Sequence, residues 1–167
     1  MREQLTKKDV ERIEKEIEHR KLVVRKEAIE AVKEARAHGD LSENFEYHAA
    51  KKDKNKNESR IRYLERMLKT AEIISEDSAA DEVGLNNTVT LYFEDEEECE
   101  EFRLVTSIRG NSLKNLISIE SPLGRAVFGK KAGERVYVPV SENAGYYVEI
   151  RSIEKTGDDG SDTIRSF

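Results

Sequence analysis

The sequence predicts two folds in one chain: a long antiparallel α-helical coiled-coil hairpin, then a small antiparallel sheet with one short helix, an α+β domain. Apolar residues recur at helical spacings in the first half, whereas short β-branched runs between turn residues fill the second. The balance of charged residues also differs between the two halves. Residues 1–74 carry 19 Lys and Arg against 16 Asp and Glu, and residues 75–167 carry 10 against 19. We expect a coiled-coil domain over 1–76, a linker over 77–84, a sheet domain over 85–155 and a disordered tail over 156–167.

The composition restricts the class of protein. Hydrophobic residues make up 37% of the 167 residues and charged residues 38%, which suits a chain with a long exposed element. A single cysteine, Cys99, excludes an internal disulfide and fits a reducing compartment. The chain shows no signal peptide and no apolar run of roughly 20 residues, so we expect a cytoplasmic protein without a membrane partner. Its net charge of −6 argues against tight, independent DNA binding.

The first helix is expected to start near Thr6 and to end at Gly39, because glycine favours the left-handed conformation that closes helices. A narrow apolar stripe of coiled-coil type runs along it and is interrupted around Arg20 and Lys21. The stripe consists of Val10, Ile13, Ile17, Val24, Ala28, Val32 and Ala35.

The second helix is expected to run from Asp40–Ser42 to about Ile74. Apolar residues at helical spacing mark its far half: Ile61, Leu64, Met67 or Leu68, Ala71 and Ile74. The segment 51–60 (KKDKNKNESR) contains no apolar residue. We therefore expect this segment to contribute little to packing against the first helix.

The second half predicts a small sheet. Strands are expected at 88–93, 102–108, 116–119, 135–140 and 146–153, because these runs are β-branched or alternate. The acidic run 94–101 is predicted to be the solvated end of a hairpin. A short helix is expected from Pro122 to Phe128, closed by Gly129.

Asp40 and Glu43 are the strongest candidates for chemistry. They lie three residues apart just after Gly39, at the predicted tip of the hairpin. Asp40 at an N-cap with Glu43 at N3 has the spacing of a capping box. The same carboxylates could complete a half-formed Mg²⁺ site on another molecule and help orient an attacking water. The two interpretations are compatible. A zinc site that adds His38 and His48 matches no closed tetrahedral spacing.

Basic and aromatic residues flank the acids. A run of lysines, with Arg36 across the hairpin, could follow a nucleic-acid backbone or could be a solvated helix face. The run consists of Lys51, Lys52, Lys54 and Lys56. Tyr47 is expected to pack across the two helices. Phe45 remains open between packing at the tip and contact with a partner.

Two segments closely resemble the Gre family of bacterial transcript-cleavage factors, GreA type. The first is GDLSENFEYHAAK at 39–51 and the second is NLISIESPLGRAVFGKKAGERVYVPV at 115–140. The resemblance extends from about residue 5 to 154. It implies an N-terminal antiparallel coiled coil and a C-terminal domain with an FKBP-like fold that docks on RNA polymerase.

The resemblance also implies a function. Such factors insert the coiled coil through the secondary channel of RNA polymerase, where the tip acids help bind a second Mg²⁺ and activate water. The polymerase then cleaves its backtracked RNA. The resemblance therefore implies an accessory factor, not an enzyme, that has no cofactor or metal of its own and uses a Mg²⁺ held by the polymerase. We expect a monomer.

Residue roles follow from the matching positions. Asp40 and Glu43 fall on the catalytic acidic pair. Arg36 and Lys51 fall on basic positions that guide the RNA 3′ segment, and Lys52 lies beside them. The loop of Glu120, Ser121 and Pro122 falls on the part that meets the polymerase rim helices.

This chain departs from the family at Phe45, which is bulkier than the alanine expected there. A first alternative is therefore a Gre-fold regulator that occupies the channel without supporting cleavage. A second is a prolyl isomerase, suggested by the FKBP-like resemblance, although a fold does not carry an activity. A third is a plain coiled-coil scaffold.

Overall fold

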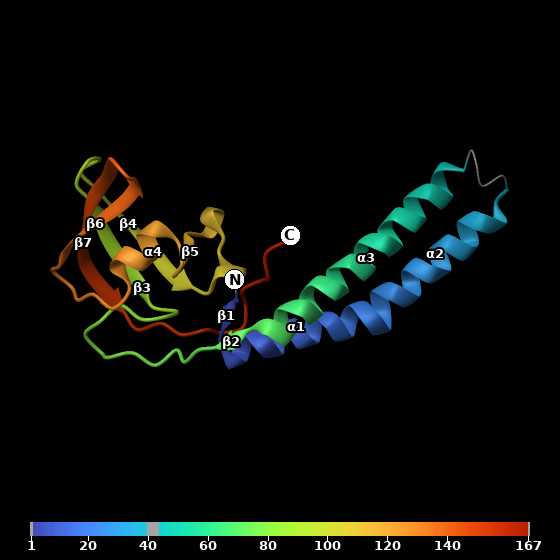
Figure 1. Cartoon of the computed structure of the whole chain (residues 1–167), viewed down its shortest axis with the longest axis horizontal. Coiled ribbons are helices and arrows are strands. Elements are labelled where there is room, and N and C mark those ends of the chain that lie inside the picture. Colours follow the sequence, from blue (N-terminus) through green and yellow to red (C-terminus); the bar gives the residue numbers. More distant parts are fainter. Residues whose placement is uncertain (1, 40–43, 167) are drawn as a thin grey trace. The chain divides into compact units, whose positions relative to one another are not determined.

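The structure is a computed structural model that describes residues 2–39 and 44–166 (Figure 1). The chain forms two compact units, one of residues 1–3 and 9–72 and the other of residues 4–8 and 73–167. The second unit includes the segments expected to be a linker and a tail. No helix among the described residues is long and apolar enough to cross a membrane.

The first unit is the predicted helical hairpin. Its outgoing arm comprises α1 (Lys7–His19), a π-helical segment η1 (Arg20–Val24) and α2 (Arg25–Ala37). Its returning arm is α3 (Phe45–Thr70), and Figure 1 shows α2 and α3 running side by side. The buried apolar residues come from both arms and include Ile13, Ile17, Ala35, Ile61, Leu64 and Met67.

The interruption of the apolar stripe has a structural cause. At η1 the Arg25 N–H donates to the Arg20 carbonyl, five residues earlier, so the helix contains one wide turn. Leu22 and Val23 of this turn are exposed. The apolar stripe is therefore interrupted at η1 and continues in α2.

The expectation that 51–60 contributes little packing is wrong for the end of that segment. Asn57 and Arg60 are buried. Arg60 Nε donates to Glu16 Oε2 at 2.9 Å, and Arg20 Nε donates to the same oxygen at 2.7 Å. Polar side chains thus form a layer of the hairpin interior where the sequence has no apolar residue.

The returning helix is shorter than predicted at both ends. It begins at Phe45 and ends at Thr70, because Ala71 already has an extended backbone. Two short strands flank the arms: β1 (Gln4–Leu5) precedes α1, and β2 (Glu72–Ile73) follows α3. The Glu72 N–H donates to Glu3 O at 2.9 Å, and the Ile74 N–H donates to Leu5 O at 2.8 Å.

The second unit contains a five-stranded sheet in the order β5-β4-β3-β7-β6. Its strands are β3 (Thr88–Phe93), β4 (Glu98–Val105), β5 (Leu116–Ser118), β6 (Arg135–Ser141) and β7 (Ala144–Glu154). The β3–β4, β3–β7 and β6–β7 pairs are antiparallel. The sheet is mixed and not purely antiparallel as predicted, because β5 pairs with β4 in parallel. This parallel pair is possible because η2 (Ser107–Arg109) and η3 (Ser112–Lys114) carry the chain back between them.

One face of the sheet forms the core. Alternate residues of β3, such as Val89 and Leu91, are fully buried and pack with residues of β4, β6 and β7. The predicted short helix is confirmed as α4 (Pro122–Val127), whose Val127 belongs to the same core. The acidic run 94–101 only partly forms a turn, because β4 already starts at Glu98.

The tail was expected to be disordered but has defined partners. Thr156 Oγ1 donates to Asn86 O at 2.6 Å, and the Arg165 N–H donates to Ile108 O at 2.7 Å. The linker is also held, because Lys155 Nζ donates to Ser78 Oγ at 2.8 Å and to Ala79 O at 2.9 Å.

Candidate functional site

The tip of the hairpin is organised by the ends of α2 and α3. The outgoing arm ends at Ala37 with His38 as its C-cap, and Gly39 follows with φ +134°, as predicted for a closing glycine. Asp40 and Glu43 lie outside the described residues. The description resumes at Asn44, directly before α3.

Asn44 joins the two arms. Its Oδ1 accepts from the Tyr47 N–H at 3.0 Å, which makes it the N-cap of α3. Its Nδ2 donates to Ala35 O in α2 at 2.6 Å. One side chain therefore caps the returning helix and ties it to the end of the outgoing helix.

The position of this cap corrects the capping-box interpretation. Because α3 begins at Phe45 with Asn44 as N-cap, Asp40 and Glu43 precede the cap and do not occupy its N-cap and N3 positions. Sequence reasoning missed Asn44, although Asn ranks with Asp and Ser among the preferred N-cap residues.

Tyr47 connects the basic residues of the tip. The Arg36 guanidinium lies 5.7 Å and the Lys51 ammonium 6.0 Å from the centroid of its ring. Both distances are within the range of cation–π attraction. The structure thus brings Arg36 and Lys51 together from opposite arms of the hairpin. Lys52 is exposed on the same helix as Lys51.

The two aromatic residues of the tip differ in burial. The Phe45 side chain is 87% exposed. Tyr47 is half-buried and also meets the His48 ring edge-on, with centroids 5.5 Å apart. The predicted packing role of Tyr47 agrees with this geometry, and Phe45 presents an apolar ring to the surroundings.

The histidines do not gather around a metal. His38 Nδ1 lies 3.1 Å from Glu46 Oε2, and both side chains are exposed. Within residues 2–39 and 44–166, no group of three or more His, Cys, Asp or Glu side chains is placed to hold a metal ion.

The predicted docking loop lies between β5 and α4. Ser121 is the N-cap of α4, since its Oγ accepts from the Gly124 N–H at 3.1 Å and donates to Ser118 O at 2.6 Å. Glu120 is half-exposed and Pro122 is exposed. The loop is therefore a tight, defined turn whose charged and proline side chains reach the surface.

Arginines of the hairpin arms lower the pKa of two glutamates, Glu58 and Glu16, and so favour their ionised forms. Arg25 Nε and Nη2 donate to the two carboxylate oxygens of Glu58 at 2.9 and 2.8 Å, and these bonds lower the pKa of Glu58. Burial alone would raise the pKa of Glu16, but hydrogen bonds from Arg60 and Arg20 outweigh it and lower that pKa.

Comparisons with known proteins cover nearly the whole chain. A family model described as "Transcription elongation factor, N-terminal" matches residues 3–73, and one described as "Transcription elongation factor, GreA/GreB, C-term" matches residues 76–155. Transcription elongation factor GreA of Streptococcus gordonii is 43% identical over 155 residues, covering 91% of this chain and 95% of that protein. GreA of Streptococcus sanguinis is 41% identical over 153 residues with the same coverage.

A solved structure is also similar. GreA factor homolog 1 (Gfh1) protein of Thermus thermophilus is 26% identical and covers 92% of this chain and 99% of that chain, with a TM-score of 0.43.

Proposed function

Because the chain belongs to the GreA/GreB family of transcription elongation factors, we propose that it inserts its hairpin into the RNA polymerase secondary channel and stimulates cleavage of backtracked RNA. The observation that carries this proposal is the N-cap of α3. Asn44 caps α3 and also bonds to Ala35 O in α2, so the two arms are joined directly beside the sequence segment that contains Asp40 and Glu43. The 26 residues of α3 give about 39 Å of helix, a reach suited to a channel.

Carboxylate oxygens are ligands suited to Mg²⁺, which in proteins is usually bound by one or two carboxylates together with phosphates and water. Asp40 and Glu43 would complete the coordination of a Mg²⁺ that the polymerase holds. Such an ion would supply an activated water and would stabilise the attacking and leaving oxygens. The protein is on this proposal an accessory factor, without a complete active site or a metal of its own.

Arg36 and Lys51 would hold the 3′ segment of the backtracked RNA. Tyr47 keeps their charges on one side of the tip, at 5.7 and 6.0 Å from its ring. Phosphate contacts position a nucleic acid without reading its sequence, which suits a factor that must act on any transcript. Lys52, which is exposed, would add positive charge for the same RNA segment.

The second unit would dock on the polymerase rim helices through Glu120, Ser121 and Pro122. Its mixed sheet with α4 supports an FKBP-like fold, although fold alone gives no isomerase activity. We expect the protein to act as a monomer in the cytoplasm, where bacterial polymerase works.

The test is RNA cleavage in a stalled, backtracked elongation complex with Mg²⁺. Asp40→Ala and Glu43→Ala should each lose at least about tenfold in stimulated cleavage, because groups around metal ligands typically contribute 10–100-fold. Both variants should still bind polymerase. Glu46→Ala is the matched control, since it removes an exposed carboxylate of the first turn of α3 and should cleave normally.

Two results would contradict the proposal. If Asp40→Ala stimulated cleavage at the wild-type rate, the Asp40 carboxylate would have no role in cleavage. Wild-type binding to polymerase without any cleavage would instead indicate the Gre-fold regulator that occupies the channel without cleaving.

A further inference from the structure

Arg109 is a charged side chain inside the second unit. It ends η2 and is only 1% exposed. Its Nε donates to Thr106 Oγ1 at 3.2 Å. A hydroxyl does not neutralise a guanidinium, and a buried cation without an anion nearby is strongly unfavourable. An anionic group must therefore lie against Arg109.

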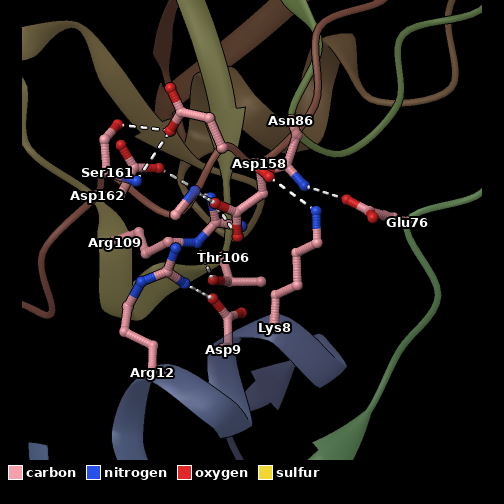
Figure 2. A network of polar contacts seen from close by, with 12 residues as sticks. Lys8, Asp9, Arg12, Glu76, Asn86, Thr106, Arg109, Asp158, Ser161 and Asp162 are labelled. Atoms are coloured by element: carbon pink, nitrogen blue, oxygen red, sulfur yellow. Dashed lines mark hydrogen bonds and ion pairs between the residues drawn. The ribbon is translucent and has the colours of Figure 1, made fainter. Parts of the chain in front are cut away.

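The C-terminal tail supplies that group. Arg109 Nη1 donates to Asp162 Oδ2 at 3.0 Å and lies 3.8 Å from Asp158 Oδ2. The other oxygen of Asp162 accepts from Arg103 Nη2 in β4. Asp162 thus bridges two guanidinium groups, and Figure 2 shows Asp158 and Asp162 converging on Arg109.

The path of the tail brings its two aspartates to one place. Gly160 has φ +83°, a left-handed conformation that favours glycine, and its N–H donates to Asp158 Oδ1 at 2.9 Å. Lys8 Nζ donates to the Asp158 carbonyl at 2.8 Å. The Arg165 N–H donates to Ile108 O at 2.7 Å, beside Arg109 in η2.

The tail is held by polar contacts. Residues 157–163 (GDDGSDT) contain no large apolar side chain, and among the residues that the structure describes the hydrophobic core of the second unit contains none from the tail. The family model for this half ends at residue 155, so the tail is an addition to the matched region. A second acidic segment could make the same ion pairs.

We propose that Arg103 and Arg109 form a binding site for an acidic protein segment, and that tail residues 157–165 are its intramolecular ligand. A partner segment with two carboxylates four residues apart would take the place of Asp158 and Asp162. This interaction is separate from transcript cleavage and needs neither Asp40 nor Glu43.

The surroundings of the site favour a peptide. A hollow of about 400 Å³ adjoins Asp162 and is lined by Arg103, Lys114, Asn115 and Ser161 among others, so a bound segment could extend into it. The groups that pair with Arg103 and Arg109 in the structure are carboxylates of a peptide segment, which favours a peptide over nucleic acid as the competing ligand.

The test uses the full-length protein and a labelled synthetic peptide of residues 156–167. The tethered tail competes at an effective concentration on the order of millimolar, so wild type should bind the peptide weakly. Asp158→Asn with Asp162→Asn should bind it at least about tenfold more tightly, because its own tail no longer competes. Asp159→Asn is the matched control and should behave nearly as wild type, since Asp159 is exposed, its carboxylate accepts hydrogen bonds from Ser161, and the charge of Arg103 acts on it more weakly than those bonds do.

Peptide binding that is equal in all three proteins, or absent from all three, would overturn the proposal. So would equal binding of an RNA oligonucleotide by the double variant, or of a peptide with both aspartates changed to asparagine.

Hydrogen exchange keeps the proposal testable if the double variant does not fold. The Arg165 amide should be protected in wild type, should exchange at least about tenfold faster in Asp162→Asn, and should be unchanged in Asp159→Asn. An unprotected Arg165 amide in wild type would show that the tail does not occupy the site.

Discussion

Asn57 and Arg20 form a reciprocal pair of hydrogen bonds across the helical hairpin. Asn57 Nδ2 donates to the Arg20 carbonyl at 3.2 Å, and Arg20 Nη1 donates to Asn57 Oδ1 at 3.0 Å. The same carbonyl accepts from the Arg25 N–H in the wide turn of η1. The irregular turn in one arm is therefore matched by an amide in the other, which aligns the two helices.

Removing this amide should destabilise the hairpin. Asn57→Ala removes two part-buried hydrogen bonds to Arg20, which together are worth about 1–3 kcal/mol. The free energy of unfolding, followed by the helical circular dichroism signal in urea, should fall by that amount. Asn55→Ala, two residues earlier and exposed, should change it by less than about 0.5 kcal/mol. Equal losses in both variants would show that the pair has no special role.

Acid should weaken the hairpin through Glu16. Because its pKa is lowered in the folded chain, its stabilising contribution is complete above its ordinary pKa of 4.5 and is lost as pH falls through the lowered value. Glu16→Gln should therefore reduce the decline of the urea midpoint below pH 4.5. Glu14→Gln, at an exposed position, should decline as wild type does, and a Glu16→Gln curve parallel to wild type would contradict the assignment.

The two tip aromatics should respond differently to truncation. Phe45→Ala should leave the free energy of unfolding within about 0.5 kcal/mol, because its ring is 87% exposed. Tyr47→Ala should lower it by about 1–2 kcal/mol, since the half-buried ring contacts Arg36, Lys51 and His48. Thermal unfolding of both variants measures the difference. A larger loss for Phe45→Ala than for Tyr47→Ala would contradict these contacts.

The docking loop should not tolerate a side chain at Gly124. A Cβ there would collide with the Ser118 carbonyl oxygen, and overpacking typically costs about 1–3 kcal/mol. Gly124→Ala should lower the free energy of unfolding of the second unit by this amount and should weaken polymerase binding. Unfolding and polymerase binding are measured on the same batch of purified protein. Gly157→Ala meets nothing within 4 Å and serves as the control, so a comparable loss there would refute the steric explanation.

Local patterns in the sequence correctly indicated most elements. The apolar stripe predicted the hairpin, Gly39 predicted the end of the outgoing helix, and Pro122 predicted the start of α4. These features depend on residues a few positions apart, so the chain itself carries the signal. The start of α3 was missed because Asp40 and Asn44 are both good N-caps by residue type; in the structure the Tyr47 N–H donates to Asn44 Oδ1, which makes Asn44 the cap.

The sequence by itself determined the division into a helical half and a sheet half and the family resemblance. Only the tertiary structure decided which polar residues meet. Asn57 bonds to Arg20 across 37 residues and Asp162 to Arg109 across 53. From composition, the segment that contains Asn57 was predicted to contribute little packing, and the tail was predicted to be disordered. Asn57 is held by two hydrogen bonds to Arg20 of the other arm, and the tail is held because the buried Arg109 guanidinium needs an anionic partner, which proximity in space supplies.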